Sequence, residues 1–267
     1  MEPPQGRELK FLDRPEVGRV LFHPRPERDR PAPDGLLVVD VRARDGTLLR
    51  GRLSPAGPEA PLLLWFPGNG ELAQDYDALA PHLRDLGVGL LVFDHRGYGA
   101  SAGRPSAGDL LRDADDVRRA LTAKLASAGL HPSRLVVVGR SLGSAPAIDL
   151  AAHAGPEVDG LLLLSPFADT FGLLTRLGYG ASLDDRDERL DGFCNLDGVR
   201  AVHVPVLCLH GTADRVIPFH EGRALAEAAH GRFVPLDGAG HNDWFSVGHD
   251  AFFAAVRELV ITAPTRY

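Results

Sequence analysis

The fold is decided by a stretch near the middle of the chain, Leu135-Val136-Val137-Val138-Gly139-Arg140-Ser141-Leu142-Gly143. Four apolar residues predict a buried strand, and Gly-x-Ser-x-Gly follows at 139–143. The small residues at 144–147 can begin a helix. A sharp turn from strand to helix needs residues without bulk, and Gly139 and Gly143 provide them. The turn would hold the Ser141 hydroxyl at the end of the strand. Glycines around a serine also occur in ordinary tight turns, but this context favours a nucleophile.

Composition predicts one folded domain without a membrane anchor. The chain has 267 residues, 44% of them hydrophobic, which suits a single α/β domain. A net charge of −7 without a dense basic stripe argues against nucleic-acid binding. Residues 1–7 lack the apolar core of a signal peptide, and no apolar run approaches the roughly 20 residues that span a bilayer. Two cysteines imply no disulfide framework. We therefore expect a cytoplasmic protein.

Short apolar stretches alternate with helical ones along most of the chain. The expected strands are residues 35–41, 48–53, 62–66, 89–93, 135–138, 161–164, 206–209 and 232–236, and the expected helices are residues 73–86, 107–129, 143–154, 221–229 and 250–261. Asp45-Gly46 indicates an antiparallel hairpin between the first two strands. The later strands are apolar on both faces, which is typical of a parallel sheet covered on both sides. The sequence thus predicts an α/β fold with a mostly parallel, twisted sheet of about eight strands and helices on both faces.

The chain contains no composition break that would mark a second large domain. Residues 1–34 are rich in proline, arginine and charge, and we expect them to form an N-terminal surface segment. Residues 35–267 are expected to form a single domain. Within it, residues 166–203 break the alternation and predict a small helical excursion over the strand ends.

Three residues with complementary chemistry follow three of the predicted strands. Ser141, Asp214 and His241 should meet, because the carboxyl ends of parallel strands share one edge of a sheet. A serine hydroxyl needs a base such as histidine, and the histidine needs a carboxylate to fix its tautomer. Asp214 alone could be a turn residue and His241 a surface residue, but their joint placement favours a catalytic triad. We expect His95 and His210 to be structural.

The tetrahedral oxyanion of such a reaction needs two N–H donors. Leu142, directly after the nucleophile, should give one from the start of the following helix. The loop after the strand at 62–66 should give the other, from Asn69 or alternatively Gly70. The same loop could be a plain turn.

At this point the chain resembles the α/β-hydrolase-fold serine hydrolases, and within them the compact, lidless esterase and thioesterase-like subgroup. The motifs that carry the resemblance lie at 66–69, 94–101, 139–143, 210–214 and 238–242, within a match over about residues 18–260. One departure is Pro67, where the family usually has a histidine that shapes the oxyanion loop. The resemblance implies the α/β-hydrolase fold and catalysis that needs no metal or organic cofactor.

The expected activity is hydrolysis of carboxylic esters or thioesters through an acyl-enzyme intermediate. The alternatives are a serine peptidase or amidase of the same fold and a non-catalytic binding protein. We expect a small-molecule or lipid-like acyl substrate, and the oligomeric state is not indicated. Candidate substrate-binding side chains, which could equally belong to the core, are Phe167, Phe171, Leu174, Trp244 and Phe245.

Overall fold

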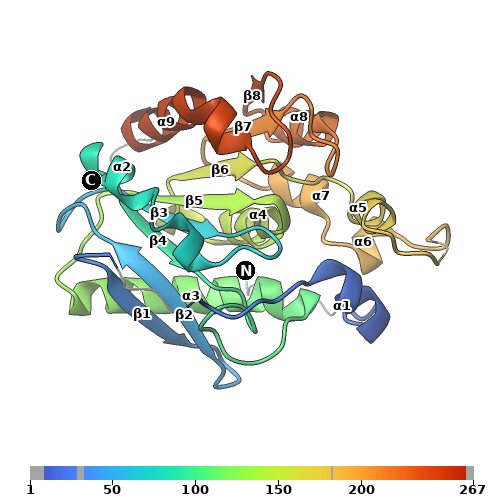
Figure 1. Ribbon diagram of the computed structural model, residues 1–267, viewed down its shortest axis with the longest axis horizontal. Helices are drawn as coiled ribbons and strands as arrows, with labels where there is room; N and C mark the ends of the chain where they lie inside the picture. Colours follow the sequence, from blue (N-terminus) through green and yellow to red (C-terminus); the bar gives the residue numbers. More distant parts are fainter. Residues whose placement is uncertain (1–8, 29–32, 182, 263–267) are drawn as a thin grey trace.

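The computed structural model of the chain describes residues 9–28, 33–181 and 183–262 (Figure 1). Eight strands form one sheet in the order β1-β2-β4-β3-β5-β6-β7-β8. Their bounds are β1 Leu37–Arg42, β2 Leu48–Ser54, β3 Leu62–Phe66, β4 Gly89–Phe93, β5 Leu135–Arg140, β6 Gly160–Leu164, β7 Val206–Gly211 and β8 Arg232–Leu236. The predicted fold class is confirmed.

Strand pairing places the site at one point of the sheet. β1 and β2 are antiparallel, as is the pair β2 and β4, whereas β4, β3, β5, β6, β7 and β8 run parallel. β3 pairs with β4 on one side and with β5 on the other, so the strand order reverses there. In open α/β sheets, ligands bind at such a switch point, outside the carboxyl ends of the strands.

Helices cover both faces of the sheet, as the both-face-apolar strands require. The helical elements are α1 Pro15–Leu21, η1 Ala73–Tyr76, α2 Ala80–Asp85, α3 Ala107–Ser127, η2 Ser141–Gly143, α4 Ser144–His153, η3 Gly155–Glu157, α5 Thr170–Arg176, α6 Glu188–Asp191, α7 Asn195–Arg200, α8 Phe219–Ala228 and α9 Trp244–Thr262. The predicted helix at 73–86 is instead two short elements, η1 and α2, and Pro81 occupies the first turn of α2, where its fixed φ is tolerated.

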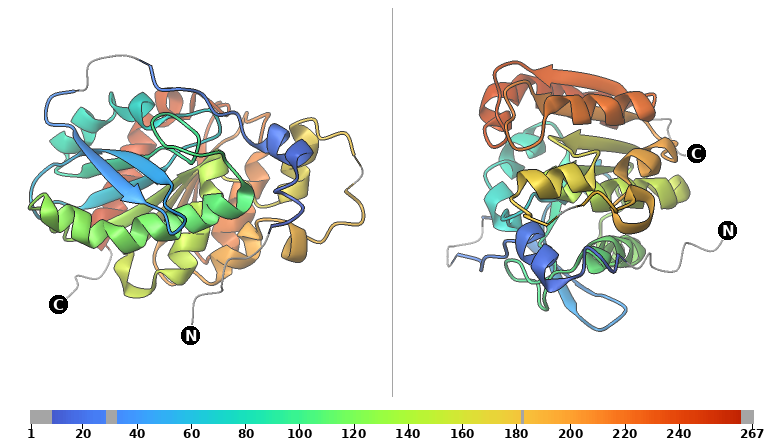
Figure 2. Two further views of the ribbon diagram at one scale, coloured as in Figure 1. Left: turned by 90° about the horizontal axis from the view of Figure 1, so that it is seen from below. Right: turned by 90° about the vertical axis from the view of Figure 1, so that its right-hand side faces the viewer.

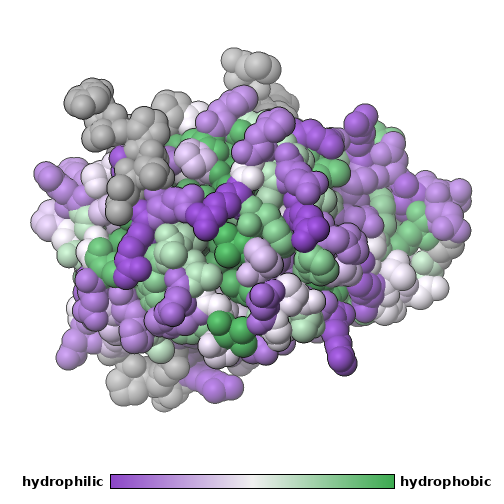
Figure 3. Space-filling view, turned by 90° about the horizontal axis from the view of Figure 1, so that it is seen from above, coloured by the Kyte–Doolittle hydropathy of each residue, from purple (hydrophilic) through white to green (hydrophobic). Residues whose placement is uncertain are grey.

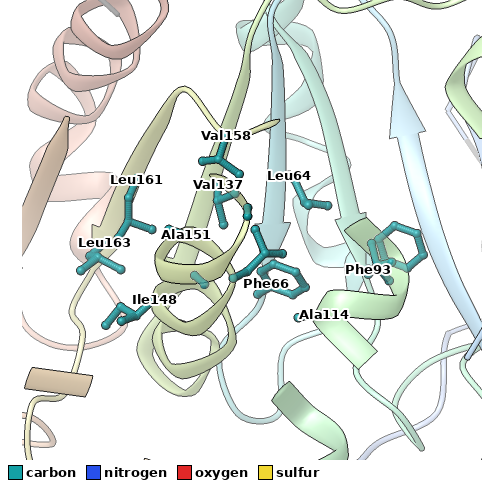
Figure 4. Close-up of a cluster of buried hydrophobic side chains, with 14 of the residues drawn as sticks. Leu64, Phe66, Phe93, Ala114, Val137, Ile148, Ala151, Val158, Leu161 and Leu163 are labelled. Atoms are coloured by element: carbon teal, nitrogen blue, oxygen red, sulfur yellow. The ribbon is translucent and has the colours of Figure 1, made fainter. Parts of the chain in front are cut away.

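Alternate side chains of each strand enter two different cores. Leu64, Phe66, Val137 and Leu163 pack with α3, α4, α7 and α8 (Figure 4). Their chain neighbours, such as Trp65, pack on the other face against η1, α2 and α9. This period of two is the expected geometry of a strand. From the side of α8 and α9, apolar side chains lie interspersed among polar ones (Figure 3). In the described part of the chain, no helix is both long and apolar enough to cross a membrane.

A third apolar cluster lies at the carboxyl ends of the strands, and the N-terminal segment contributes to it. Leu9, Leu12, Val17 and Leu21 are each at most 1% exposed and pack with residues of α3, α4 and α5. α1 lies beside α5 in two views of the molecule (Figures 1 and 2). Within residues 9–22 the apolar side chains are buried, whereas charged ones such as Arg14, Glu16 and Arg19 are exposed, so this part of the segment lies on the surface with one buried face. Residues 1–8 and 29–32 of that predicted segment lie outside the described residues.

The excursion predicted at 166–203 consists of the three short helices α5, α6 and α7. α7 packs against α4 and α8, on one face of the sheet, whereas α5 contacts α1. The excursion and the N-terminal segment therefore meet over the ends of the strands.

Candidate active site

Ser141 stands on a sharp turn between β5 and α4. Its φ of 49° lies in the left-handed region, which a non-glycine residue adopts only at a cost of about 1–3 kcal/mol. Two glycines leave room for the turn. A Cβ on Gly139 would lie 2.6 Å from the Cβ of Ala147, and a Cβ on Gly143 would lie 2.1 Å from the carbonyl oxygen of Phe66. The turn therefore lies directly against the end of β3 and the loop that follows it.

Replacing Gly143 with alanine should destabilise the protein, because the new Cβ would meet the backbone of β3 and could not be relieved by a side-chain rotation. Overpacking of this kind costs about 1–3 kcal/mol, measurable as a lower urea midpoint. Gly18→Ala in α1 is the matched control, because a Cβ there meets nothing within 4 Å. An unchanged urea midpoint for Gly143→Ala would contradict the close approach of the turn to β3.

The three residues predicted to act together are in contact. Ser141 Oγ lies 3.0 Å from His241 Nε2, and His241 Nδ1 lies 2.7 Å from Asp214 Oδ2. Asp214 follows β7 and His241 follows β8, the strand beside it. With a proton on Nδ1 donated to Asp214, the Nε2 lone pair faces the serine hydroxyl. This is the tautomer that a general base requires.

The Asp214 carboxylate is fully buried and well satisfied by donors. Its Oδ1 accepts from the N–H groups of Val216 and Ile217, each at 2.9 Å, and its Oδ2 lies 3.2 Å from His210 Nε2. Burial opposes the charged form of Asp214, but hydrogen bonds from His210 and His241 outweigh it and hold the pKa of the carboxyl below its ordinary value of 3.8. Asp214 is therefore ionised at neutral pH. His210 also lies 2.9 Å from the Ile217 carbonyl, so it shapes this loop.

Several side chains hold the loop after β3, in which Pro67 stands where the family usually has a histidine. His95 Nε2 lies 2.8 Å from the Pro67 carbonyl oxygen, and burial lowers the pKa of His95, so the neutral ring donates this bond. Glu71 Oε2 accepts from the Gly68 N–H at 2.6 Å. The Asn69 side chain accepts from the Tyr98 hydroxyl at 2.8 Å and lies 2.8 Å from His23 Nδ1.

These contacts separate the candidate oxyanion donors. The Gly68 N–H is already engaged by Glu71. Asn69 lines the cleft beside Ser141 together with Leu142, and Gly70 is not among the lining residues. Leu142 and Asn69 therefore both line the cleft with Ser141, and the assignment of their N–H groups as oxyanion donors stays a prediction.

A cleft of about 220 Å³ opens beside Ser141. Its lining residues come from six parts of the chain: Leu21, His23, Asn69, Arg140, Ser141, Leu142, Leu173, Leu177, Val216, His241 and Asn242. Five of these side chains are aliphatic, so the cleft combines an apolar wall with polar groups near Ser141. Such a combination is typical of small-molecule sites.

None of the five candidate substrate-binding side chains lines this cleft. Phe167 and Leu174 are fully buried in the third cluster, and Phe171 packs against Phe11. Trp244 and Phe245 begin α9 on the other face of the sheet, where the Trp244 ring lies 6.2 Å from that of Trp65. On α5 the assignment fails by one residue, because Leu173, and not its neighbour, faces the cleft. The cleft beside Ser141 therefore does not include these five residues, and their role in acyl binding stays a prediction.

Sequence reasoning also missed residues that the cleft contains. Leu21 and His23 belong to the segment expected to wrap over the surface, and Arg140 occupies the first variable position of the Gly-x-Ser-x-Gly pattern. The available signal for Arg140 was a charged side chain that follows four apolar strand residues and Gly139. In the described ranges, no group of three or more His, Cys, Asp or Glu residues is placed to hold a metal ion.

Fold and site together define an α/β-hydrolase. Residues 57–173 match a family described as "Serine aminopeptidase, S33". An uncharacterised protein of Mycobacterium tuberculosis is 34% identical over 90% of this chain and 81% of its own length. The human α/β hydrolase domain-containing protein 17B is 32% identical over 79% of this chain and 70% of its own length. The chain belongs to the α/β-hydrolase family.

Solved structures agree on the fold. An esterase from Pyrococcus furiosus has a TM-score of 0.73 at 19% identity and covers 91% of this chain and 99% of its own. A hydrolase from Pseudomonas aeruginosa has a TM-score of 0.65 at 25% identity, with coverage of 84% and 98%. Family and fold together support hydrolase activity.

Proposed function

We propose that this protein is a serine hydrolase that cleaves carboxylic esters or thioesters through an acyl-enzyme intermediate. The continuous chain of contacts from Ser141 through His241 to Asp214, which opens onto a cleft with an aliphatic wall, carries this proposal. No cofactor is needed for the reaction as proposed. The substrate would be a small-molecule or lipid-like acyl compound.

The proposed reaction runs in two halves. His241 Nε2 takes the hydroxyl proton as Ser141 Oγ attacks the carbonyl carbon, and the Leu142 and Asn69 N–H groups donate hydrogen bonds to the carbonyl oxygen as negative charge develops on it. Collapse of the tetrahedral intermediate expels the alcohol or thiol, which receives the proton from His241. Water then attacks the acyl-enzyme, with His241 again as base, and releases the acid and free Ser141.

The cleft favours this substrate class over a peptide. A peptidase that recognises a free N-terminus needs an anion to bind the protonated amine, since an unpaired charge is costly to bury. The lining residues include no carboxylate, and the nearby Glu71 is paired with Arg140 at 3.1 Å. The aliphatic side chains suit an acyl chain.

The test is covalent labelling followed by a substrate panel. We expect a fluorophosphonate probe to label the protein at Ser141, identified by peptide mass spectrometry. Hydrolysis of p-nitrophenyl esters and acyl thioesters should exceed that of aminoacyl p-nitroanilides. Labelling without ester or thioester turnover, but with p-nitroanilide cleavage, would establish the peptidase instead. Absence of labelling would leave the non-catalytic binding protein.

A further inference from the structure

Arg140 is a buried cation directly before the nucleophile. It ends β5, and its side chain is only 3% exposed. Burial of a charge is costly unless partners satisfy it, so each partner of Arg140 is informative. The partners come from the two loops on which the proposed reaction depends.

Arg140 donates hydrogen bonds to the loop that carries His241. Its Nη2 donates to the His241 carbonyl oxygen at 2.8 Å and to Asn242 Oδ1 at 2.9 Å. Its Nη1 lies 3.3 Å from His241 Nε2, the atom that faces Ser141. The guanidinium therefore fixes the backbone beside the base and places a positive charge next to its reactive nitrogen.

Through Glu71, Arg140 also holds the oxyanion loop. Arg140 Nε lies 3.1 Å from Glu71 Oε1, while Glu71 Oε2 accepts from the Gly68 N–H at 2.6 Å and from the Tyr76 hydroxyl at 2.5 Å. A Cβ on Gly68 would lie 2.6 Å from Arg140 Nη1 and 2.8 Å from Glu71 Oε2. The ion pair thus packs directly against the residue before Asn69.

We propose that Arg140 and Glu71 are a pair of positioning residues that set the base loop and the oxyanion loop at a fixed separation around Ser141. The pair also adjusts the charge at His241, because the cation opposes a proton on Nε2 and the carboxylate screens the cation. This inference rests on the proposed function. It extends the triad by a polar link that joins three strand ends through one guanidinium.

Because of the charges around His241, neutralising Arg140 and neutralising Glu71 should shift the protonation of His241 in opposite directions. Asp214, backed by His210, favours the imidazolium from the β7 side, and Arg140 opposes it from β5. Asp243 lies in the same loop as His241 and accepts from the Gly240 N–H. His23 lines the cleft from the N-terminal segment. If Arg140 is neutralised, Glu71 is left uncompensated and His241 holds its proton to higher pH. If Glu71 is neutralised, the unscreened Arg140 has the opposite effect.

The experiment compares Arg140→Met, Glu71→Gln, the double variant and Arg140→Lys, with kcat and KM for p-nitrophenyl acetate measured from about pH 5 to pH 9. A displacement of catalytic groups costs on the order of 10²-fold, so each single variant should lose about 10- to 100-fold in kcat with little change in KM. The acidic limb of the kcat/KM profile should move to higher pH in Arg140→Met and to lower pH in Glu71→Gln. The double variant should lose less than the product of the two losses, because the residues act as one unit.

Arg140→Lys separates charge from geometry. Lysine keeps the positive charge but lacks the planar fork that binds Glu71 and the His241 loop together. Its kcat should fall while its acidic limb stays near that of the wild type. Arg118→Met is the matched control, since it breaks ion pairs with Asp115 and Glu157 away from the carboxyl ends of the strands. It should keep the wild-type kcat and pH profile.

The outcomes distinguish the two proposals. A wild type that neither labels with fluorophosphonate nor hydrolyses esters or thioesters overturns the proposed function, and this inference with it. An active wild type whose Arg140 and Glu71 variants keep both kcat and the acidic limb overturns only the inference. The inference would also be overturned if the acidic limb of the kcat/KM profile moved in the same direction, by the same amount, in both single variants. If Arg140→Met fails to fold, Glu71→Gln and Arg140→Lys still decide the outcome.

Discussion

Replacing Ser141 with alanine is expected to lower ester hydrolysis by about 10⁴- to 10⁶-fold, because the only group that His241 could activate in this geometry is removed. The oxyanion donors and the cleft would remain, so binding of substrate should survive. Turnover of p-nitrophenyl acetate, with a thioester in parallel, measures the loss. Fluorophosphonate labelling should disappear in the same variant.

Ser246→Ala is the matched control for that experiment. Ser246 is exposed and donates to the Asp243 carbonyl oxygen, away from the nucleophile. It should retain wild-type turnover, and both variants should unfold at nearly the wild-type temperature. Undiminished turnover in Ser141→Ala would rule out the acyl-enzyme mechanism.

The fold and the meeting of Ser141, His241 and Asp214 could be predicted because they depend on local patterns joined by one geometric rule. β3, β5, β6 and β7 are apolar on both faces, which in a chain of this length indicates a parallel sheet covered by helices. Parallel strands then deliver their following loops to one edge. Ser141 and His241 are 100 residues apart in the sequence, yet each could be predicted from the strand that directly precedes its loop.

The walls of the cleft could not be predicted by the same reasoning. α5 carries apolar side chains around much of its circumference, so periodicity does not decide whether Leu173 or Leu174 faces the cleft. Which of the two leucines faces the cleft is set by the packing of α5 against α1, a segment about 150 residues earlier. The same holds for Arg140, since its burial depends on Glu71 in a loop 69 residues earlier and on Asn242 in a loop 102 residues later.

Replacing Asp214 with asparagine is expected to lower kcat by about 10⁴-fold. The carboxylate uses both oxygens as acceptors, one for the Val216 and Ile217 N–H groups and one for His241 and His210. An asparagine has one oxygen, which the two backbone N–H groups would hold. Its NH₂ would then face His241 Nδ1 and force the ring proton onto Nε2, so no lone pair would face Ser141. Asp237→Asn, exposed in the loop before His241, is the control that should keep its activity.

The Asp214→Asn variant also has a signature in stability that a purely catalytic role would lack. The folded protein stabilises the ionised form of Asp214 more than the unfolded chain does, because folding lowers the pKa of Asp214 from 3.8. That stabilisation is fully present above the unfolded-state value and is lost as the pH falls through the native value. The gap in free energy of unfolding between wild type and variant should therefore be wide at pH 7 and narrower below about pH 4, as measured by urea unfolding at both pH values. A gap independent of pH, or a kcat within tenfold of the wild type, would show that His241 is oriented by something other than the charge of Asp214.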